Sequence, residues 1–358
     1  MSTLFRRAFT FLNNTKLPKI RRVPKIVEEE GDDVEDFKQL EIDLMGLREN
    51  PDITVWQAAE TGNRAALQYF IENSEDRSSL LNARDPDTNC TLLHMVIINA
   101  KQHKSPVLPL LRLLLKNGAD ARLCGMYSAQ AIHMVPVHCL DQPVACLELL
   151  LKYKADVNAR DGDGWTPLHY AARFCENPEP VVHMLISRGA QVNACDVHKK
   201  TPLFVLMANN NDHADLLYWL IHTAKADLSI LGYYCDPYTQ EARAGSLVFQ
   251  AAKYNRPGCL AVLIHSAIET LCKVITQDEV TAAGNYVQGH PAMVHLLHEL
   301  QISLESNYES PMYNYGLYAE RRRPSMMTVL GLVGPSSHGN KLFRKANKFM
   351  RRTKSHKI

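Results

Sequence analysis

The sequence predicts an all-α chain built from repeated helix-turn-helix units. One phrase, Asp161-Gly-Asp-Gly-Trp-Thr-Pro-Leu-His-Tyr-Ala-Ala172, recurs in shortened form as Thr91-Leu-Leu-His94 and as Thr201-Pro-Leu-Phe204. An apolar helical stretch and a closing phrase follow each copy. The closing phrases are Asn117-Gly-Ala-Asp120, Lys154-Ala-Asp-Val-Asn158, Arg188-Gly-Ala-Gln-Val-Asn193 and Lys225-Ala-Asp-Leu228. Recurrence at near-constant spacing indicates a repeat architecture.

Each residue of the phrase has a mechanical role in the predicted unit. Thr166 is expected to cap the first helix, and Pro167 suits the first helical position because an N–H there would be unpaired anyway. Ala171 and Ala172 allow the next repeat to approach closely. Gly189 is expected to end the second helix in a left-handed conformation. The unit is therefore predicted to be a helix, a turn, a second helix and a β-turn finger.

These phrases resemble the ankyrin repeat. The resemblance implies a solenoid of about six to seven units whose concave face binds other proteins. Aligned on the Thr position, the units are expected to start near Ile53, Thr91, Gln130, Thr166, Thr201, Ser246 and Val280. The outer units match weakly, as expected of end repeats with a single neighbour.

Two closing phrases depart from the family pattern. Lys154 and Lys225 stand where glycine is usual. We expect each lysine to adopt a left-handed conformation, at a cost of up to about 1 kcal/mol.

The chain divides into three predicted parts: a tail over 1–50, the repeats over 51–303, and a second tail over 304–358. The first tail is basic and then acidic, and the second begins with a Tyr-rich linker (Tyr308, Tyr313, Tyr315 and Tyr318). That linker is expected to cover the last repeat or to act as a linear motif.

Charge separates the repeats from the tails. Residues 1–27 carry seven Lys/Arg and no acid, residues 28–36 carry seven acids and no base, and residues 321–358 carry eleven Lys/Arg and no acid. The chain's net charge of +2 therefore leaves −9 for residues 37–320. Charge blocks of this kind are typical of solvated, disordered tails.

The composition favours an intracellular protein. The nine cysteines form no C-x-x-C pair, which indicates reduced thiols. No secretory signal is visible, and no apolar run reaches the roughly 18 residues that a spanning helix needs. We expect a cytoplasmic location, with membrane-peripheral and nuclear locations as alternatives.

The C-terminal tail contains a basic amphipathic segment within residues 341–352. Its candidate contact residues are Leu342, Phe343, Arg344, Lys345, Lys348, Phe349, Arg351 and Arg352. Such a segment can lie on an anionic membrane surface or dock in a partner's groove. A solvated tail and a nuclear-import or nucleic-acid role remain open. Ser325 follows two arginines and a proline and is a candidate phosphorylation site.

An insertion of about ten residues lengthens one finger, within Leu231–Gly245. It contains Tyr233, Tyr234 and Tyr238, which are of a residue type common at interface hot spots. The alternative is an irregular loop packed on its own repeat.

The repeated histidines His94, His133 and His169 invite a metal interpretation. They occupy one position of successive units, where the family's histidine hydrogen-bonds neighbouring backbone, so we expect no metal. His295 and His298 lack a visible third ligand. No phosphate-binding glycine loop or nucleophile elbow appears, so neither a cofactor nor an enzymatic activity is expected.

The resemblance places the contact surface on the finger tips and first helices. The residues there are Met126, Tyr127, Asp163, Trp165, Arg173, Phe174, Val197, His198 and Lys200. Trp165 is the foremost candidate, with packing against the adjacent finger as the alternative. The predicted function is a non-enzymatic scaffold or adaptor that binds another protein. A membrane-peripheral adaptor and a ubiquitin-ligase substrate receptor are the alternatives.

Overall fold

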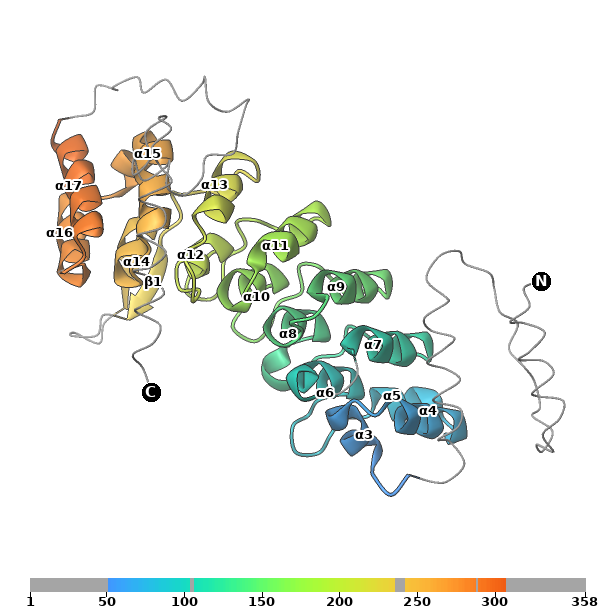
Figure 1. Cartoon of the computed structure of the whole chain (residues 1–358). Coiled ribbons are helices and arrows are strands. Elements are labelled where there is room, and N and C mark those ends of the chain that lie inside the picture. Colours follow the sequence, from blue (N-terminus) through green and yellow to red (C-terminus); the bar gives the residue numbers. More distant parts are fainter. Residues whose placement is uncertain (1–50, 104–105, 236–241, 288, 307–358) are drawn as a thin grey trace, which may run out of the picture. The chain divides into compact units, whose positions relative to one another are not determined.

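The computed structural model describes residues 51–103, 106–235, 242–287 and 289–306. Within them, helices form seven consecutive pairs: α3 (Val55–Thr61) with α4 (Arg64–Asn73), α6 (Leu92–Ile98) with α7 (Val107–Lys116), α8 (Ala131–His138) with α9 (Pro143–Lys152), α10 (Pro167–Phe174) with α11 (Pro178–Ser187), α12 (Pro202–Leu206) with α13 (Ala214–His222), α14 (Leu247–Lys253) with α15 (Pro257–Val274), and α16 (Gln277–Tyr286) with α17 (Pro291–Glu305). Figure 1 shows the first helices of the pairs in one row and the second helices in another.

The predicted helix starts are confirmed for the first six repeats, and the last one is wrong. The N-caps are Thr54, Thr91, Gln130, Thr166, Thr201, Ser246 and Thr276. The first start therefore lies one residue after Ile53. The last lies four residues before Val280, because only Ile275 and Thr276 join α15 to α16 and the last repeat has no finger before it.

The stack is held together by apolar packing between successive repeats. Helix α10 packs against α8 on one side and α12 on the other, and α9 packs against α7 and α11. Leu168, Ala171 and Ala172 on α10 are buried, which agrees with the predicted close approach of the next repeat at the two alanines. The all-α repeat fold is confirmed, because each helix pair buries its apolar face on its neighbours.

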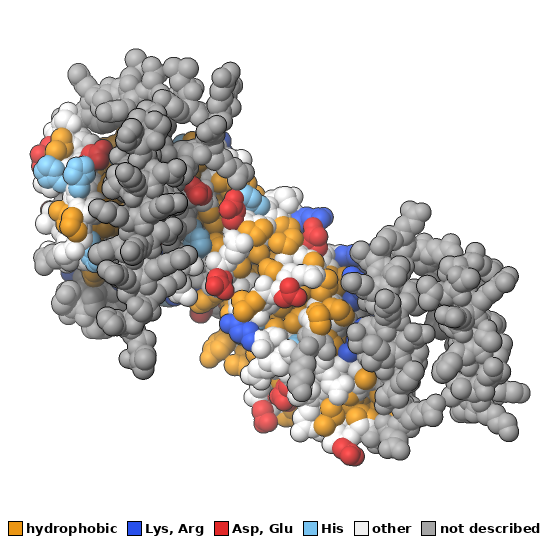
Figure 2. Space-filling view, in the orientation of Figure 1, with side chains coloured by type: hydrophobic (Ala, Val, Ile, Leu, Met, Phe, Trp, Pro, Cys, Tyr) orange, Lys and Arg blue, Asp and Glu red, His pale blue; other side chains and the backbone are white. Residues whose placement is uncertain are grey.

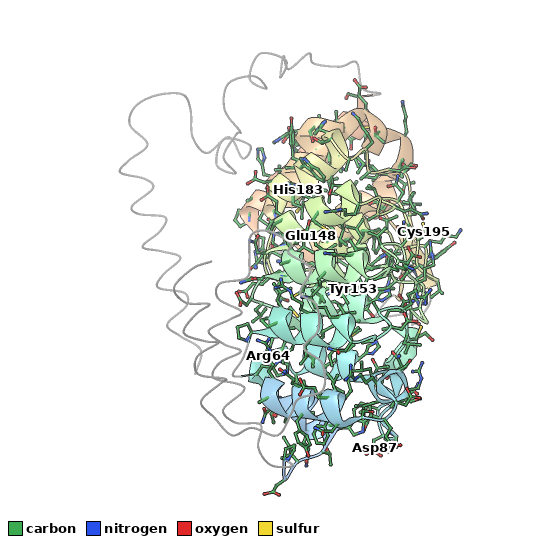
Figure 3. The ribbon with its side chains drawn as sticks, turned by 90° about the vertical axis from the view of Figure 1, so that its right-hand side faces the viewer. Arg64, Asp87, Glu148, Tyr153, His183 and Cys195 are labelled. Carbon is green, nitrogen blue, oxygen red and sulfur yellow. The ribbon has the colours of Figure 1, made fainter. Side chains whose placement is uncertain are left out.

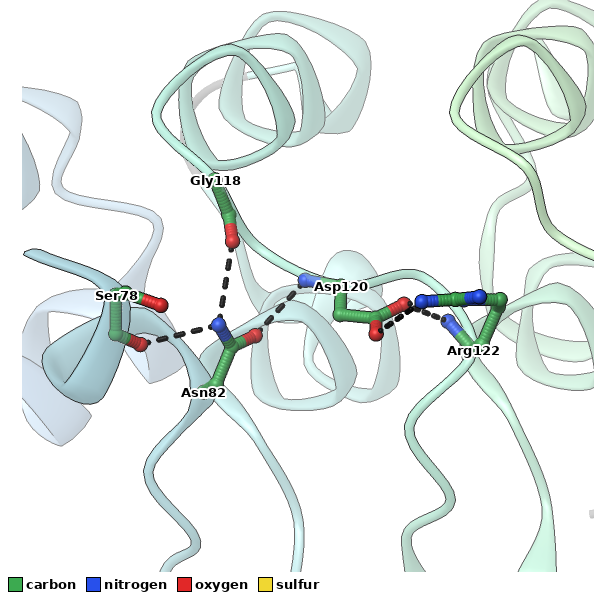
Figure 4. Close-up of polar contacts among 5 residues, drawn as sticks. All are labelled: Ser78, Asn82, Gly118, Asp120 and Arg122. Carbon is green, nitrogen blue, oxygen red and sulfur yellow. Dashed lines mark hydrogen bonds and ion pairs between the residues drawn. The ribbon is translucent and has the colours of Figure 1, made fainter.

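Three asparagines, two of them in closing phrases, tie one repeat to the next. Asn82, at the end of the short helix α5 (Arg77–Asn82), donates to the Gly118 carbonyl at 3.2 Å and accepts from the Asp120 N–H at 2.8 Å (Figure 4). Asn158 makes the same two bonds to the next closing phrase, at 3.0 Å and 2.8 Å. Asn193 accepts from the Asp227 N–H at 2.9 Å. These bonds satisfy backbone groups that end the second helices.

The repeated histidines make a second set of ties, as predicted. In each, Nδ1 faces the residue that caps its own helix, and Nε2 reaches a carbonyl of the next finger. The Nε2 contacts are His94 to Ala129 at 3.2 Å, His133 to Ala159 at 3.0 Å and His169 to Lys200 at 3.0 Å. Burial lowers the pKa of His94 to about 4 and also lowers the pKa of His133 and His169. The three rings are therefore neutral at pH 7, with Nε2 donating.

Lys154 and Lys225 take left-handed conformations, with φ of 67° and 60°, as their place in the repeat predicts. The lengthened finger differs from the expected turn. It forms a two-stranded antiparallel hairpin of β1 (Gly232–Cys235) and β2 (Ala242–Gly245). Gly232 lies so close to Phe204 that a Cβ there would be 2.8 Å from the ring, so a side chain at this position would displace the hairpin.

Helix α15 corrects the expectation that no segment is long and apolar enough to span a membrane. Its 18 residues have a mean hydropathy of 1.3 and pass that test by length and composition. The helix packs against α13, α14 and α17, and residues 258–264 are buried in this core. It is also kinked at Ala267, where φ is −142°. Its apolar character is accounted for by packing within the stack.

Candidate protein-binding surface

Backbone hydrogen bonds join the fingers of the third to sixth repeats. The Gly162 N–H donates to the Tyr127 carbonyl at 2.7 Å, and the Val197 N–H donates to the Asp163 carbonyl at 3.0 Å. The Tyr233 N–H of β1 then donates to the His198 carbonyl at 2.8 Å. The predicted finger-tip residues therefore lie along one continuous edge.

This edge lies on one side of the stack. In Figure 3, Asp87 and Cys195 of the finger region lie along one long side, and Arg64 of α4 lies toward the other. Figure 2 shows hydrophobic side chains gathered over the middle repeats of the face in view.

Two large apolar side chains project from the third finger, in the short 3-10 turn η2 (Met126–Ser128). Met126 is 47% exposed and Tyr127 is 80% exposed. Tyr127 and Ser128 are both left-handed, with φ of 54° and 58°. This conformation costs roughly 1–2 kcal/mol for each residue other than glycine. The fold therefore exposes a tyrosine on a strained turn.

Trp165 belongs to an aromatic cluster on the fourth repeat. Its half-buried ring stacks on Phe174 with centroids 5.9 Å apart and meets Tyr170 edge-on at 5.6 Å. Its indole N–H donates to Asp196 of the next finger at 3.0 Å. This bond agrees with the alternative that Trp165 packs against the adjacent finger, because it gives the indole N–H a partner inside the stack. Binding of a partner by Trp165 remains a prediction.

The remaining predicted residues differ in exposure. Asp163, His198 and Val197 are exposed, while Arg173 and Lys200 are half-buried. On the hairpin, Tyr233 is exposed, but Tyr234 is half-buried and stacks on Phe249 with centroids 4.5 Å apart. The two neighbouring tyrosines differ because successive side chains of a strand point to opposite faces.

Next to the third finger lies a cavity of about 250 Å³. Met126 and Tyr127 line it together with Ile98 of α6, Met134 of α8 and Tyr170 of α10. The sequence did not point to the last three residues. Met134 and Tyr170 each lie four residues after an N-cap, and this shared place was the signal that could have identified them; Ile98 lies seven residues after Thr91. We name this hollow the apolar groove.

Several sequence-based candidates cannot be placed. Tyr238, Ser325 and the tail residues Leu342–Arg352 lie outside the described residues. Among the residues that are described, no three His, Cys, Asp or Glu side chains are grouped so as to hold a metal ion. His295 and His298 both lie on α17.

Comparison with known proteins agrees with this geometry. The family description "Ankyrin repeats (3 copies)" matches residues 104–196 and 134–241. Residues 104–241 are therefore ankyrin repeats, and repeats of this family stack into protein-interaction scaffolds.

Relatives match parts of the chain. An ankyrin repeat protein of variola virus is 34% identical over 116 residues, which are 32% of this chain and 20% of that protein. A putative palmitoyltransferase of Danio rerio is 31% identical over 173 residues, 48% of this chain and 24% of that protein. The regulatory subunit 27 of protein phosphatase 1 of Mus musculus is 46% identical over 52 residues, 14% of this chain and 32% of that protein. The chain thus spans between a fifth and a third of each of these relatives.

Proposed function

We propose that this chain is a non-enzymatic scaffold or adaptor that binds another protein through the fingers and first helices of its third to fifth repeats. The repeat fold, the hydrogen-bonded finger edge and the apolar groove support this proposal. One relative, a regulatory subunit of a phosphatase, is by its printed name a protein that acts on another protein.

The exposure of Tyr127 is the observation that carries the proposal. A strained turn holds a large aromatic ring in solvent next to Met126, which is 47% exposed. On the next two repeats, Phe174 and Val197 are also exposed, at 45% and 63%. Aromatic side chains that are displayed in this way are enriched among interface hot spots.

Site-specific photo-crosslinking tests the proposal. A benzophenone amino acid replaces Tyr127 in the full chain, expressed in cells. The same replacement of Tyr218, which is 38% exposed on the outer helix α13, serves as the matched control. We expect a discrete protein adduct from position 127 and none from position 218. Equal adducts at both positions, or none at position 127, would refute binding at the fingers.

A further inference from the structure

One column of positions lies seven residues after each N-cap, on the first helix or just past its end. From the second to the sixth repeat it holds Ile98, Val137, Arg173, Ala208 and Lys253. All five are half-buried, so they line the same surface. The column is apolar in the second and third repeats and carries cations in the fourth and sixth.

The two cations are arranged alike. Arg173 lies over the ring of the next residue, Phe174, at 5.0 Å from its centroid. Lys253 lies 5.8 Å from the ring of its own next residue, Tyr254, and 5.2 Å from the ring of Tyr234. The same cation and aromatic pair therefore occurs at equivalent places of two repeats.

Lysines of the fifth finger lie between these pairs. Lys200 occupies the place before the N-cap that Trp165 occupies in the fourth repeat. Its neighbour Lys199 lies over the Tyr233 ring at 5.4 Å. We name Arg173, Lys199, Lys200 and Lys253 the basic strip.

No carboxylate of the described residues forms an ion pair with the basic strip. Elsewhere in the stack such pairs occur, as between Arg122 and Asp120 and between Arg188 and Glu148, both at 2.9 Å. The buried carboxylate of Asp196, in the same finger as Lys199 and Lys200, accepts from the Trp165 indole N–H at 3.0 Å and from the Lys200 backbone N–H at 2.7 Å. The charged side-chain groups of the strip are therefore left without an ion-pair partner among the described residues.

The apolar groove and the basic strip adjoin at the fourth repeat. Tyr170 lines the groove, and its ring lies 5.9 Å from the ring of Phe174, over which Arg173 is placed. The surface therefore has an apolar half on the second to fourth repeats and a basic half on the fourth to sixth.

We propose that this surface binds an extended acidic segment of a partner protein that carries one bulky apolar residue at one end. The inference rests on the proposed protein-binding function. The apolar residue enters the groove beside Met134 and Tyr170. Acidic residues then follow along Arg173, Lys200 and Lys253, and the aromatic rings beside Arg173 and Lys253 exclude water and strengthen the charged contacts there.

The repeat spacing sets the spacing of the acids. Packed helices lie about 10 Å apart, so Arg173 and Lys253, two repeats apart, are separated by roughly 20 Å. An extended peptide advances about 3.3 Å per residue. The acids are therefore expected about three residues apart along the segment, opposite one repeat each.

A peptide-display selection on the full-length protein tests this. Random 12-residue peptides are selected, and the enriched sequences are compared for charge. We expect acidic residues spaced by about three, beside one Leu, Ile, Phe or Met. Enrichment of neutral or basic peptides would overturn the inference.

Charge reversal then locates the site. The best selected peptide is labelled, and its affinity is measured by fluorescence polarisation. The double variant Arg173→Glu/Lys253→Glu should bind at least about tenfold more weakly. Lys152→Glu, at an exposed lysine of the outer helix α9, should bind unchanged. Raising the salt concentration should weaken wild-type binding and have little effect on the double variant.

A failure of this inference can be told from a failure of the proposed function. The melting curve of the double variant verifies its fold, and Lys200→Glu provides a second variant on the strip. Equal weakening by Lys152→Glu, or none by either strip variant, would overturn the acidic-segment inference. An adduct at position 127 in the crosslinking experiment would still support protein binding.

Discussion

Mild acid should destabilise the stack through its buried histidines, and His94 gives the clearest case. The His94 ring is 2% exposed, and its pKa falls from 6.5 to about 4 because burial disfavours the charged ring. A pKa lowered in the folded state means that unfolded chains bind the proton more readily. Stability is therefore fully present above pH 6.5 and is lost as the pH falls toward 4.

The magnitude follows from the two pKa values of His94. A shift of this size corresponds to about 3 kcal/mol over the whole window, of which about 2 kcal/mol is lost by pH 5. Burial lowers the pKa of His133 and His169 as well, so they act in the same direction. Carboxylates, with reference pKa values of about 4, remain largely ionised above pH 5 and contribute little there.

Urea unfolding, followed by circular dichroism at pH 7.5, 6 and 5, measures this loss. His94→Gln removes one titrating group while leaving a donor for the Ala129 carbonyl. This variant should be less stable at pH 7.5, and its loss of stability between pH 7.5 and pH 5 should be smaller than wild type by about 2 kcal/mol. His295→Gln, at an exposed histidine of α17, is the matched control and should leave the loss unchanged. Equal losses in wild type and His94→Gln would refute the reasoning.

The remaining predictions concern packing, backbone strain and the C-terminal tail. Leu168→Ala should lower the free energy of unfolding in urea by about 2–5 kcal/mol, because Leu168 is fully packed. Trp165→Ala should lower it less and should weaken partner binding. An equal loss of stability in the two variants would make Trp165 a core residue. Lys154→Gly should raise the free energy of unfolding by up to about 1 kcal/mol, because glycine adopts a φ of 67° without strain. Lys152→Gly, at a helical position, is the control and should lower it. A loss of stability in both variants would contradict the strain argument. A peptide of residues 338–358 should become helical on anionic but not neutral vesicles, as measured by circular dichroism and sedimentation; a peptide that stays disordered and unbound on both would exclude membrane anchoring.

The repeat architecture could be predicted from the sequence because it depends on interactions between residues within one or two helical turns. Thr166 and Pro167 start a helix wherever they occur together, because capping and a missing N–H act within one turn. Recurrence in register predicts the backbone contacts of the histidines for a similar reason, since a residue at the same place of each unit performs the same task. The same reasoning predicts the left-handed conformations of Lys154 and Lys225.

The tertiary structure decided what depends on neighbours. Sequence alone could not show that Trp165 donates to Asp196, because that bond joins two repeats whose separation the fold sets. The sequence also predicted the start of the last repeat four residues too late, because this repeat matches the repeat pattern weakly and has no finger before it. The orientation of the hairpin also decides which tyrosine is exposed: Tyr233 faces solvent, and Tyr234 packs on Phe249.

The candidate binding surface also has residues that the sequence predicts and residues that only the tertiary structure brings together. Met126, Tyr127 and Phe174 could be proposed from their place in the repeat, because the repeat fixes which positions face outward. The groove that Met126 and Tyr127 form with Ile98, Met134 and Tyr170 could not, since its lining comes from three helices far apart in the chain. The sequence by itself determined the unit and its periodicity, because these depend on interactions within a few residues. The stacking of units determined the surface, because only stacking brings equivalent positions of successive repeats into one column.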